Sequence, residues 1–230
     1  AASVKDVIIT HMHYDHSGNL GLFPNATFHM QDSEMAYVTG RAMTHDSLRH
    51  SFVLSEVQEM VAAVYGDRVE FHDGDEDIAP GVSVHHMPGH TPGLQSVRVN
   101  TKRGPVVVAS DAAHYYESIT DGSPFMNHES LFKMLEGFRR LRKLAPSDQH
   151  IVPGHDPIVL QRYPAASPEL EGIVARLDLS EVADIAREYE WKKVIHVRIG
   201  GQRRQDSVRI GLKALPECDW VIVHEVRAHW

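Results

Sequence analysis

The 230-residue chain has a single cysteine, Cys218, which excludes a disulfide framework and a zinc cluster built on thiolates. No apolar run reaches the length of a membrane span, and the first ten residues lack the pattern of a signal peptide. We therefore expect a cytoplasmic protein without a membrane partner. The 23 lysines and arginines are outnumbered by 31 acidic residues and form no basic cluster, which argues against nucleic acid as an obligate partner.

The rest of the composition is that of an ordinary globular domain, with 42% hydrophobic and 23% charged residues. A chain of this length can bury a sizeable core without covalent cross-links. Histidine is the exception, because the chain has 17 of them. The spacing of one subset of these histidines points to a functional site.

The hydrophobic pattern predicts strands and helices in alternation, joined by turns rich in glycine and proline. Strands are expected at 4–10, 26–30, 69–72, 82–87 and 150–153, and a hairpin at 95–100 and 105–109. Helices are expected at 33–38 with Ser33 as the N-cap, and at 55–65, 128–144 and 168–177. The expected fold class is α/β.

The densest group of metal-binding residue types follows the first predicted strand. His11, His13, Asp15 and His16 lie within six residues of one another. Such a cluster can serve two cations, provided that a further ligand is shared between them. Imidazole and carboxylate without thiolate suit zinc, and they also suit iron, manganese or cobalt.

Three further candidates lie in matching contexts later in the chain. His90 in PGHTPG and His155 in PGHD each follow a proline and a glycine. Proline restricts the backbone and glycine allows conformations that other residues avoid, so the direction of each imidazole can be fixed. Asp111 follows the apolar run 106–109, where a buried carboxylate requires a charge partner. With these three residues, the candidate ligands from the first loop form a set large enough to bind two metal ions.

The segments HMHYDH, PGHTPG, SDAAH and PGHD together resemble the metallo-β-lactamase superfamily over residues 4–178. The resemblance implies a four-layer αββα sandwich and a centre of two Zn²⁺ ions, other divalent transition metals being an alternative. One ion would be held by His11, His13 and His90, and the other by Asp15, His16 and His155. Asp111 would bridge the two ions.

Within the superfamily, the segment HTPGLQS resembles the N-acyl homoserine lactonases, the quorum-quenching enzymes. Many of these have a tyrosine three residues after the bridging aspartate, where this chain has His114 followed by Tyr115. The resemblance implies lactone hydrolysis by a hydroxide between the two cations, with His114 or Tyr115 contacting the substrate. Asp15 would transfer a proton to the leaving oxygen. Met87, Phe125 and Met126 are candidates for an acyl-chain groove, and core positions are the alternative.

The two ends of the chain depart from the family pattern. Only ten residues precede His11, where the family has a strand-rich segment, so we expect part of the N-terminal sheet to be missing and a strand edge to be exposed. A hydrolase domain is expected at 1–178 and an appended segment at 179–230. Within that segment, residues 200–208 and 219–225 resemble a piece of methylerythritol-phosphate cytidylyltransferase, although no phosphate-binding glycine-rich loop accompanies them.

Several alternatives remain open on the sequence. The chain could act on another lactone, a thioester or a phosphoester, or it could be an inactive metal-binding fragment. An oligomer is compatible with the sequence.

Overall fold

The computed structural model describes residues 2–163 and 220–222. The described chain forms two compact units. The first comprises residues 2–29, 51–70, 157–163 and 220–222, and the second comprises residues 30–50 and 71–156. The predicted helix at 168–177 and most of the predicted segment 179–230 lie outside the described residues, so the boundary at 178 stays a prediction.

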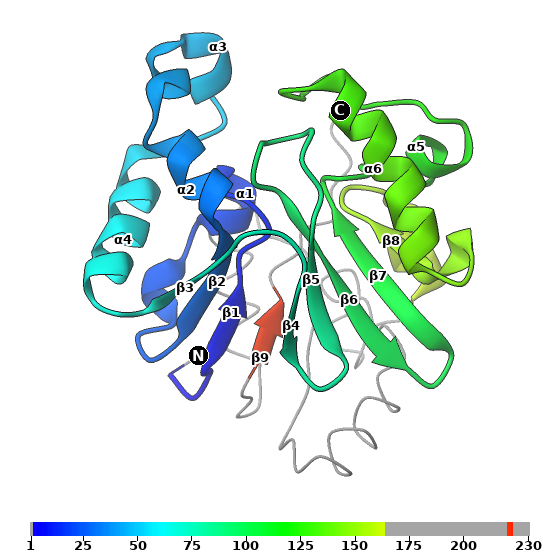
Figure 1. Ribbon diagram of the computed structural model, residues 1–230, viewed down its shortest axis with the longest axis horizontal. Helices are drawn as coiled ribbons and strands as arrows, with labels where there is room; N and C mark the ends of the chain where they lie inside the picture. Colours follow the sequence, from blue (N-terminus) through cyan, green and yellow to red (C-terminus); the bar gives the residue numbers. More distant parts are fainter. Residues whose placement is uncertain (1, 164–219, 223–230) are drawn as a thin grey trace. The chain divides into compact units, whose positions relative to one another are not determined.

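The first sheet has four strands in the order β3-β2-β1-β9, of which β1 and β2 are drawn in blue and β9 in red in Figure 1. Its strands are β1 (Asp6–Ile8), β2 (Thr27–Gln31), β3 (Val69–His72) and β9 (Trp220–Ile222). Strand β1 runs parallel to both of its neighbours, β2 and β9. The first strand of the chain is therefore paired on both sides and is not an exposed edge.

The second sheet lies in the second unit and has five strands in the order β4-β5-β6-β7-β8. Its strands are β4 (Glu76–Ala79), β5 (Val82–His86), β6 (Gln95–Thr101), β7 (Gly104–Ser110) and β8 (Ile151–Pro153). Strands β4 to β7 are antiparallel, and β8 returns parallel to β7. The predicted hairpin is confirmed, and Gly104 has the positive φ of 103° that its tight turn requires.

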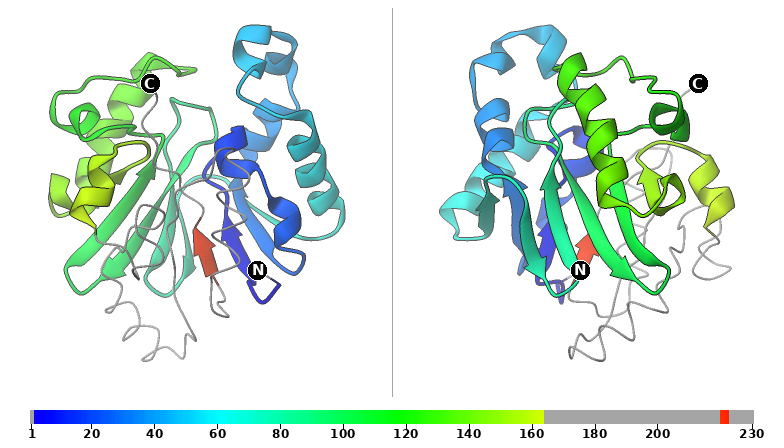
Figure 2. Two further views of the ribbon diagram at one scale, coloured as in Figure 1. Left: turned by 180° about the vertical axis from the view of Figure 1, so that it is seen from behind. Right: turned by 45° about the vertical axis from the view of Figure 1, so that its right-hand side comes forward.

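Helix α6 (Leu131–Leu144) packs against the second sheet, as Figures 1 and 2 show from three sides. It begins three residues later than predicted because Ser130 caps it, accepting a hydrogen bond from the Lys133 amide. Met134, Phe138 and Leu141 join the core of this sheet, whereas Leu131 and Leu135 are 46% and 37% exposed. The buried stripe of α6 therefore includes only part of its apolar residues.

The remaining helices are short except α4 (Leu54–Tyr65), which buries Met60 and Ala63. The others are α1 (Tyr14–Ser17), α2 (Asp32–Val38), α3 (Asp46–Arg49), α5 (Tyr116–Thr120) and α7 (Ile158–Arg162), with single 3₁₀ turns at Leu20–Leu22, Arg41–Thr44 and Asp148–His150. The prediction that Ser33 caps α2 is wrong. The helix begins before this residue, and the Ser33 hydroxyl lies 3.3 Å from the Pro92 carbonyl oxygen instead.

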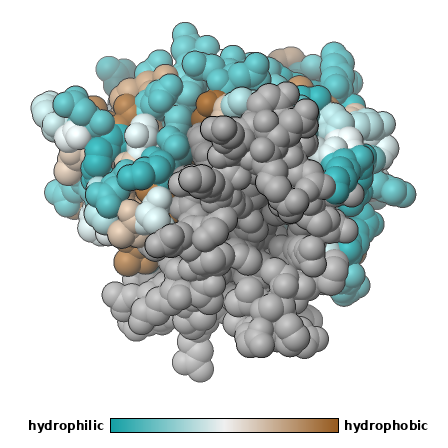
Figure 3. All heavy atoms as spheres, turned by 90° about the horizontal axis from the view of Figure 1, so that it is seen from below, coloured by the Kyte–Doolittle hydropathy of each residue, from teal (hydrophilic) through white to brown (hydrophobic). Residues whose placement is uncertain are grey.

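On the face that Figure 3 shows, the coloured residues are mostly hydrophilic. Within residues 2–163 and 220–222, no helix is long and apolar enough to cross a membrane. Several large apolar side chains are exposed, among them Leu54 and Tyr65 on α4 and Leu131 and Phe132 on α6.

Candidate metal centre

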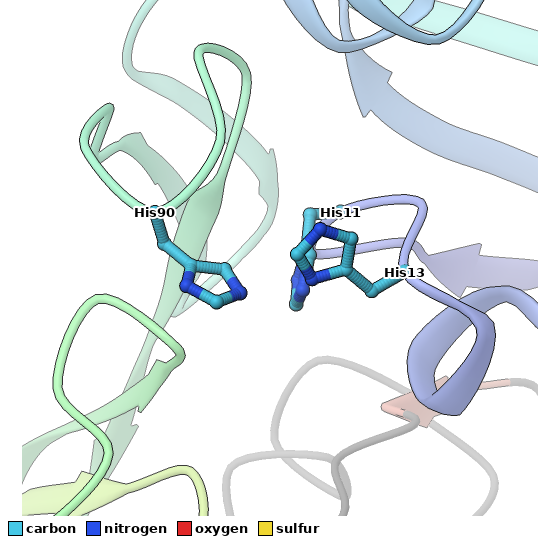
Figure 4. Close-up of side chains that lie close together, drawn as sticks. All are labelled: His11, His13 and His90. Atoms are coloured by element: carbon cyan, nitrogen blue, oxygen red, sulfur yellow. The ribbon is translucent and has the colours of Figure 1, made fainter. Parts of the chain in front are cut away.

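The first group of site residues lies where the chain leaves β1. His11 and His13 are on the loop after this strand (Figure 4), and Asp15 and His16 are on the single turn of α1 that follows. The turn starts at His13, whose carbonyl oxygen accepts hydrogen bonds from the amides of His16 and Ser17 at 2.8 and 3.0 Å. The loop and the turn thus bring the four predicted ligands of this unit close together.

The three imidazoles of this group are buried, with exposures of 0% for His11, 6% for His13 and 2% for His16. The His11 ring lies 4.6 Å from that of His13 and 4.1 Å from that of His16, centroid to centroid. The Thr10 hydroxyl lies 3.3 Å from Nδ1 of His11 and 3.4 Å from Nδ1 of His16. Both rings are thereby oriented through Nδ1, which leaves Nε2 on their opposite sides.

The buried carboxylate of Glu56 forms a hydrogen bond with the last residue of α1, Ser17. The Ser17 hydroxyl donates to Oε2 of Glu56 on α4 at 2.9 Å. Burial raises the pKa of Glu56, the bond from Ser17 opposes this effect, and the nearby charges of Asp15 and Glu59 raise it further. Gly18 is required here, because a Cβ atom would lie 2.9 Å from the Tyr14 carbonyl oxygen and 3.0 Å from Oε1 of Glu56.

The second group of site residues lies in the second unit, where loops leave β5, β7 and β8. His90 is on the PGHTPG loop after β5 (Figure 4), and its Nδ1 donates to the Asn127 carbonyl oxygen at 2.6 Å. A carbonyl oxygen can only accept, so Nδ1 carries the proton and Nε2 carries the lone pair that a metal would bind.

Asp111 stands at the centre of this group. It follows Ser110, which ends β7 with a positive φ of 51° and so turns the chain sharply. The Asp111 Oδ2 atom lies 3.2 Å from Nε2 of His90 and 3.1 Å from Nε2 of His114. Nε2 of His155 lies 3.1 Å from both oxygens. Three imidazoles therefore converge on one carboxylate that is only 3% exposed.

These separations fit a metal centre. Two ligands at zinc–nitrogen or zinc–oxygen distances of about 2.0–2.1 Å on a tetrahedral ion lie about 3.3 Å apart. The separations of 3.1 and 3.2 Å around Asp111 are close to this value and longer than most charge-assisted hydrogen bonds. Ligand atoms of His90, Asp111 and His114 all lie within 4.8 Å of one another. A set of imidazole and carboxylate donors of this kind suits zinc or a similar divalent ion.

Comparison with known proteins agrees with this donor set. The family model described as the metallo-beta-lactamase superfamily matches residues 1–155, which is more than half of the chain. The chain belongs to the metallo-β-lactamase superfamily. The mixed α/β fold with its two sheets is therefore the fold expected from the sequence, and the relatives of the chain are metal-dependent hydrolases.

Characterised relatives of this metallo-β-lactamase chain include an N-acyl homoserine lactonase from a Bacillus species, 31% identical over 152 residues. That match covers 65% of this chain and 55% of the relative. A crystal structure of a mutant of Bacillus thuringiensis AiiA with N-decanoyl-L-homoserine bound at its active site aligns with a TM-score of 0.56 and 26% identity, over 68% of this chain and 58% of that one. The chain thus spans somewhat more than half the length of these lactonases.

The second predicted resemblance is also confirmed. A 2-C-methyl-D-erythritol 4-phosphate cytidylyltransferase from Dehalococcoides mccartyi is 42% identical over 62 residues, which is 26% of this chain and 27% of that enzyme. The metallo-β-lactamase chain therefore also contains a stretch similar to a second kind of enzyme.

His114 and Tyr115 lie beside the central carboxylate of the metallo-β-lactamase site. The His114 ring is 3% exposed and stacks on Phe125, with centroids 4.1 Å apart. Burial lowers the pKa of His114 to about 4, although the Asp111 carboxylate opposes this effect. Burial also raises the pKa of Tyr115, as do the charges of Asp156 and Asp111. Near neutral pH, His114 is uncharged and Tyr115 keeps its proton.

Of the three candidates for an acyl-chain groove, Met87 is 1% exposed and belongs to the core of the second sheet. Met87 is therefore a core residue, which was the alternative to the groove.

Sequence reasoning missed several residues that support the site. Asp156, next to the metallo-β-lactamase histidine His155, accepts a hydrogen bond from the Tyr116 amide at 2.9 Å. Asn127 orients His90 through its backbone, which no side-chain pattern could reveal. Glu34 and Glu56 looked like ordinary acidic residues in the first turns of helices.

Proposed function

We propose that this chain is the catalytic part of a two-zinc hydrolase that opens the lactone ring of N-acyl homoserine lactones. The convergence of His90 and His155 on the buried Asp111 carboxylate supports this proposal most strongly. A carboxylate buried among imidazoles is costly unless cations balance its charge. Oδ2 of Asp111 faces both His90 and His155, whereas Oδ1 faces only His155 of these two. A ligand shared by two ions would use its two oxygens in different ways.

In this proposal, the loop after β1 and the loops of the second sheet contribute to one centre. His11, His13 and His90 would hold one zinc ion, and Asp15, His16 and His155 would hold the other. Asp111 would bind both. When bound, zinc ions of this kind lower the pKa of water and polarise an ester carbonyl.

The protein's own groups would position the substrate and move protons. Hydrolysis breaks the ester C–O bond of the ring and yields a carboxylate and a hydroxyl group. Asp15, whose side chain is 10% exposed, would carry the proton from the attacking water to the departing ring oxygen. His114 or Tyr115 would donate a hydrogen bond to the carbonyl or the leaving oxygen.

The substrate assignment follows the relatives, since those reported above are lactonases or are bound to N-decanoyl-L-homoserine. Phe125 stacks on His114 and lies next to Met126, whose side chain is 89% exposed. In this proposal, these two residues would contact an acyl chain beside the reacting ring. We therefore expect longer acyl chains to lower KM.

The decisive experiment loads the protein with zinc and follows acid release from N-acyl homoserine lactones of short and long chain. His155→Ala should lose turnover and bind less zinc. His45→Ala removes a histidine that is exposed on the second unit and should behave as the parent protein. Turnover that survives His155→Ala would contradict the proposal.

Two negative results would separate the alternatives. About two zinc ions bound per chain, without turnover of any lactone, would exclude the lactonase assignment and direct attention to thioesters and phosphoesters. Metal bound without turnover of any of these esters would identify an inactive metal-binding fragment.

A further inference from the structure

Glu34 lies on α2, outside the predicted ligand set, yet its side chain reaches the loop that carries His90. Oε2 of Glu34 accepts a hydrogen bond of 2.6 Å from the Thr91 hydroxyl. The same oxygen accepts a second bond, of 3.1 Å, from the Gly93 amide. Glu34 and Thr91 are each 1% exposed, so water does not compete for these bonds. The distance from the hydroxyl is at the short end of the range for an O–H···O hydrogen bond.

The contact between α2 and the loop is also tight in its backbone. A Cβ atom on Gly93 would lie 2.1 Å from the Glu34 nitrogen and 2.4 Å from its Cα, so only glycine fits. Ser33 reinforces this contact through the Pro92 carbonyl oxygen, to which its hydroxyl donates at 3.3 Å. The first turn of α2 and residues 91–93 thus form one interlocked unit.

The opposite side of the same loop is held by residues 127–130. The Ser130 amide donates to the Gly89 carbonyl oxygen at 2.9 Å, and the Asn127 carbonyl oxygen accepts from Nδ1 of His90. The Gly89 amide donates to the Thr91 carbonyl oxygen at 3.0 Å, which closes the turn around His90. The turn that carries His90 is therefore held from two sides, and Glu34 holds one of them through its side chain.

We propose that Glu34 is a positioning residue for His90. Its carboxylate holds Thr91 and Gly93, and through them it keeps Nε2 of His90 directed at Asp111. This inference rests on the metal centre of the proposed function, but it does not depend on the substrate. Residues that orient a metal ligand typically change metal affinity by about 10–100-fold when they are replaced.

The test measures zinc affinity by competition with a chromophoric chelator, in the absence of substrate. Glu34→Gln and Glu34→Ala should weaken binding by about 10–100-fold, with the larger loss in the alanine variant. Asp32→Asn is the matched control, because Asp32 is an exposed acid in the same turn of α2, and it should bind zinc as the parent does. Thermal unfolding of the zinc-free proteins measures stability separately.

Thr91 supplies a second pair of variants if the Glu34 variants do not fold. Thr91→Val removes the donor at nearly constant shape and should weaken zinc binding, whereas Thr91→Ser keeps the hydroxyl and should restore it. The absorption spectrum of the cobalt-loaded protein should change in Thr91→Val and not in Thr91→Ser.

A lower unfolding temperature with unchanged zinc affinity would show that Glu34 has a structural role only, and would overturn the inference. So would equal zinc affinities of Thr91→Val and Thr91→Ser. These outcomes differ from a failure of the proposed function. A parent protein that binds zinc without hydrolysing lactones would remove the substrate assignment and leave the Glu34 comparison intact, whereas a parent that binds no zinc would overturn both.

Discussion

Nε2 of His155 lies 3.1 Å from each carboxylate oxygen of Asp111, and both side chains are buried. The proposed two-zinc centre requires Asp111 to bind both ions. We predict that Asp111→Asn lowers the zinc content below two ions per chain, because the amide loses one anionic oxygen. The loss of affinity should exceed the change of about 10–100-fold that is typical of residues that only orient a ligand.

Elemental analysis after dialysis measures the zinc content in this comparison. Asp121→Asn is a suitable control, since Asp121 is an exposed residue at the end of α5. An unchanged zinc content in Asp111→Asn would show that Asp111 is not shared between two ions.

Glu56 should give the zinc-free protein a characteristic pH dependence. Its pKa is raised in the folded protein, first by burial, so the folded state holds the proton more tightly than the unfolded state. The free energy of unfolding contributed by this group therefore falls as pH rises from the unfolded pKa through the folded one. Glu56→Gln cannot ionise, so its stability relative to the parent should increase with pH across this interval.

Urea unfolding of the zinc-free proteins, repeated from pH 4.5 to pH 8, measures this difference; pH 4.5 is the ordinary pKa of the residue. Glu117→Gln, an exposed residue on α5, serves as the control and should follow the parent. If the curves of Glu56→Gln and the parent run parallel over the whole range, the raised pKa is wrong.

The predicted ligands could be read from the sequence because their residue types are few and their spacing is short. Strand β3 was also predicted at its observed bounds, Val69–His72, since a short run with alternating apolar residues lies between turn residues. Strand β4 was missed, because Glu76 and Asp77 are acidic and exposed on the outermost strand of the second sheet. An exposed edge strand leaves little apolar pattern by which the sequence could reveal it.

The supporting residues were beyond sequence reasoning for a different reason. An acidic residue in the first turn of a helix normally interacts with the helix dipole at the surface. Glu34 and Glu56 both occupy such positions, and nothing local distinguishes them from the exposed Asp32. Only tertiary packing brings Thr91 to Glu34 and Ser17 to Glu56. The candidate metal ligands could be predicted from the sequence, whereas the contacts of Glu34 and Glu56 could not.

Asp75 should stabilise the second unit through its hydrogen bonds with His85 and Arg140. Its carboxylate accepts hydrogen bonds from His85 and Arg140. Burial acts to raise the pKa of Asp75, but the bonds from His85 and Arg140 prevail and lower it below its ordinary value of 3.8. The resulting stability is present above the unfolded pKa and is lost as pH falls through the folded one.

We predict that Asp75→Asn lowers the free energy of unfolding near pH 7 by about 1 kcal/mol, a value kept small because the pair is partly exposed to solvent. The difference from the parent should shrink below pH 3.8, the ordinary pKa of Asp75, and vanish below its lowered folded pKa. Chemical denaturation at pH 7 and at acidic pH measures both values. A deficit that persists unchanged in acid would show that packing and not charge is responsible.

Gly137 offers a stabilising substitution. It lies inside α6, and a Cβ atom there would have no neighbour within 4 Å. Alanine is favoured over glycine in a helix interior by about 0.8–1.0 kcal/mol, so Gly137→Ala should raise the unfolding free energy by about that amount. Gly93→Ala should do the opposite, because its Cβ atom would lie 2.1 Å from the Glu34 nitrogen. Thermal unfolding separates the two, and a destabilised Gly137→Ala would show that α6 is packed differently.

Two variants of His114 should show whether this residue binds the substrate or only packs against its neighbours. Its ring stacks with those of Phe125 and His155, with centroids 4.1 and 5.1 Å away, so an aromatic replacement can keep these contacts. If His114 donates a hydrogen bond to the substrate, His114→Phe should lower kcat/KM for lactones by at least about 10-fold. His114→Tyr restores a donor and should recover much of this loss. Equal activities for the phenylalanine and tyrosine variants, with unchanged zinc content, would assign His114 to packing alone and leave Tyr115 as the remaining donor.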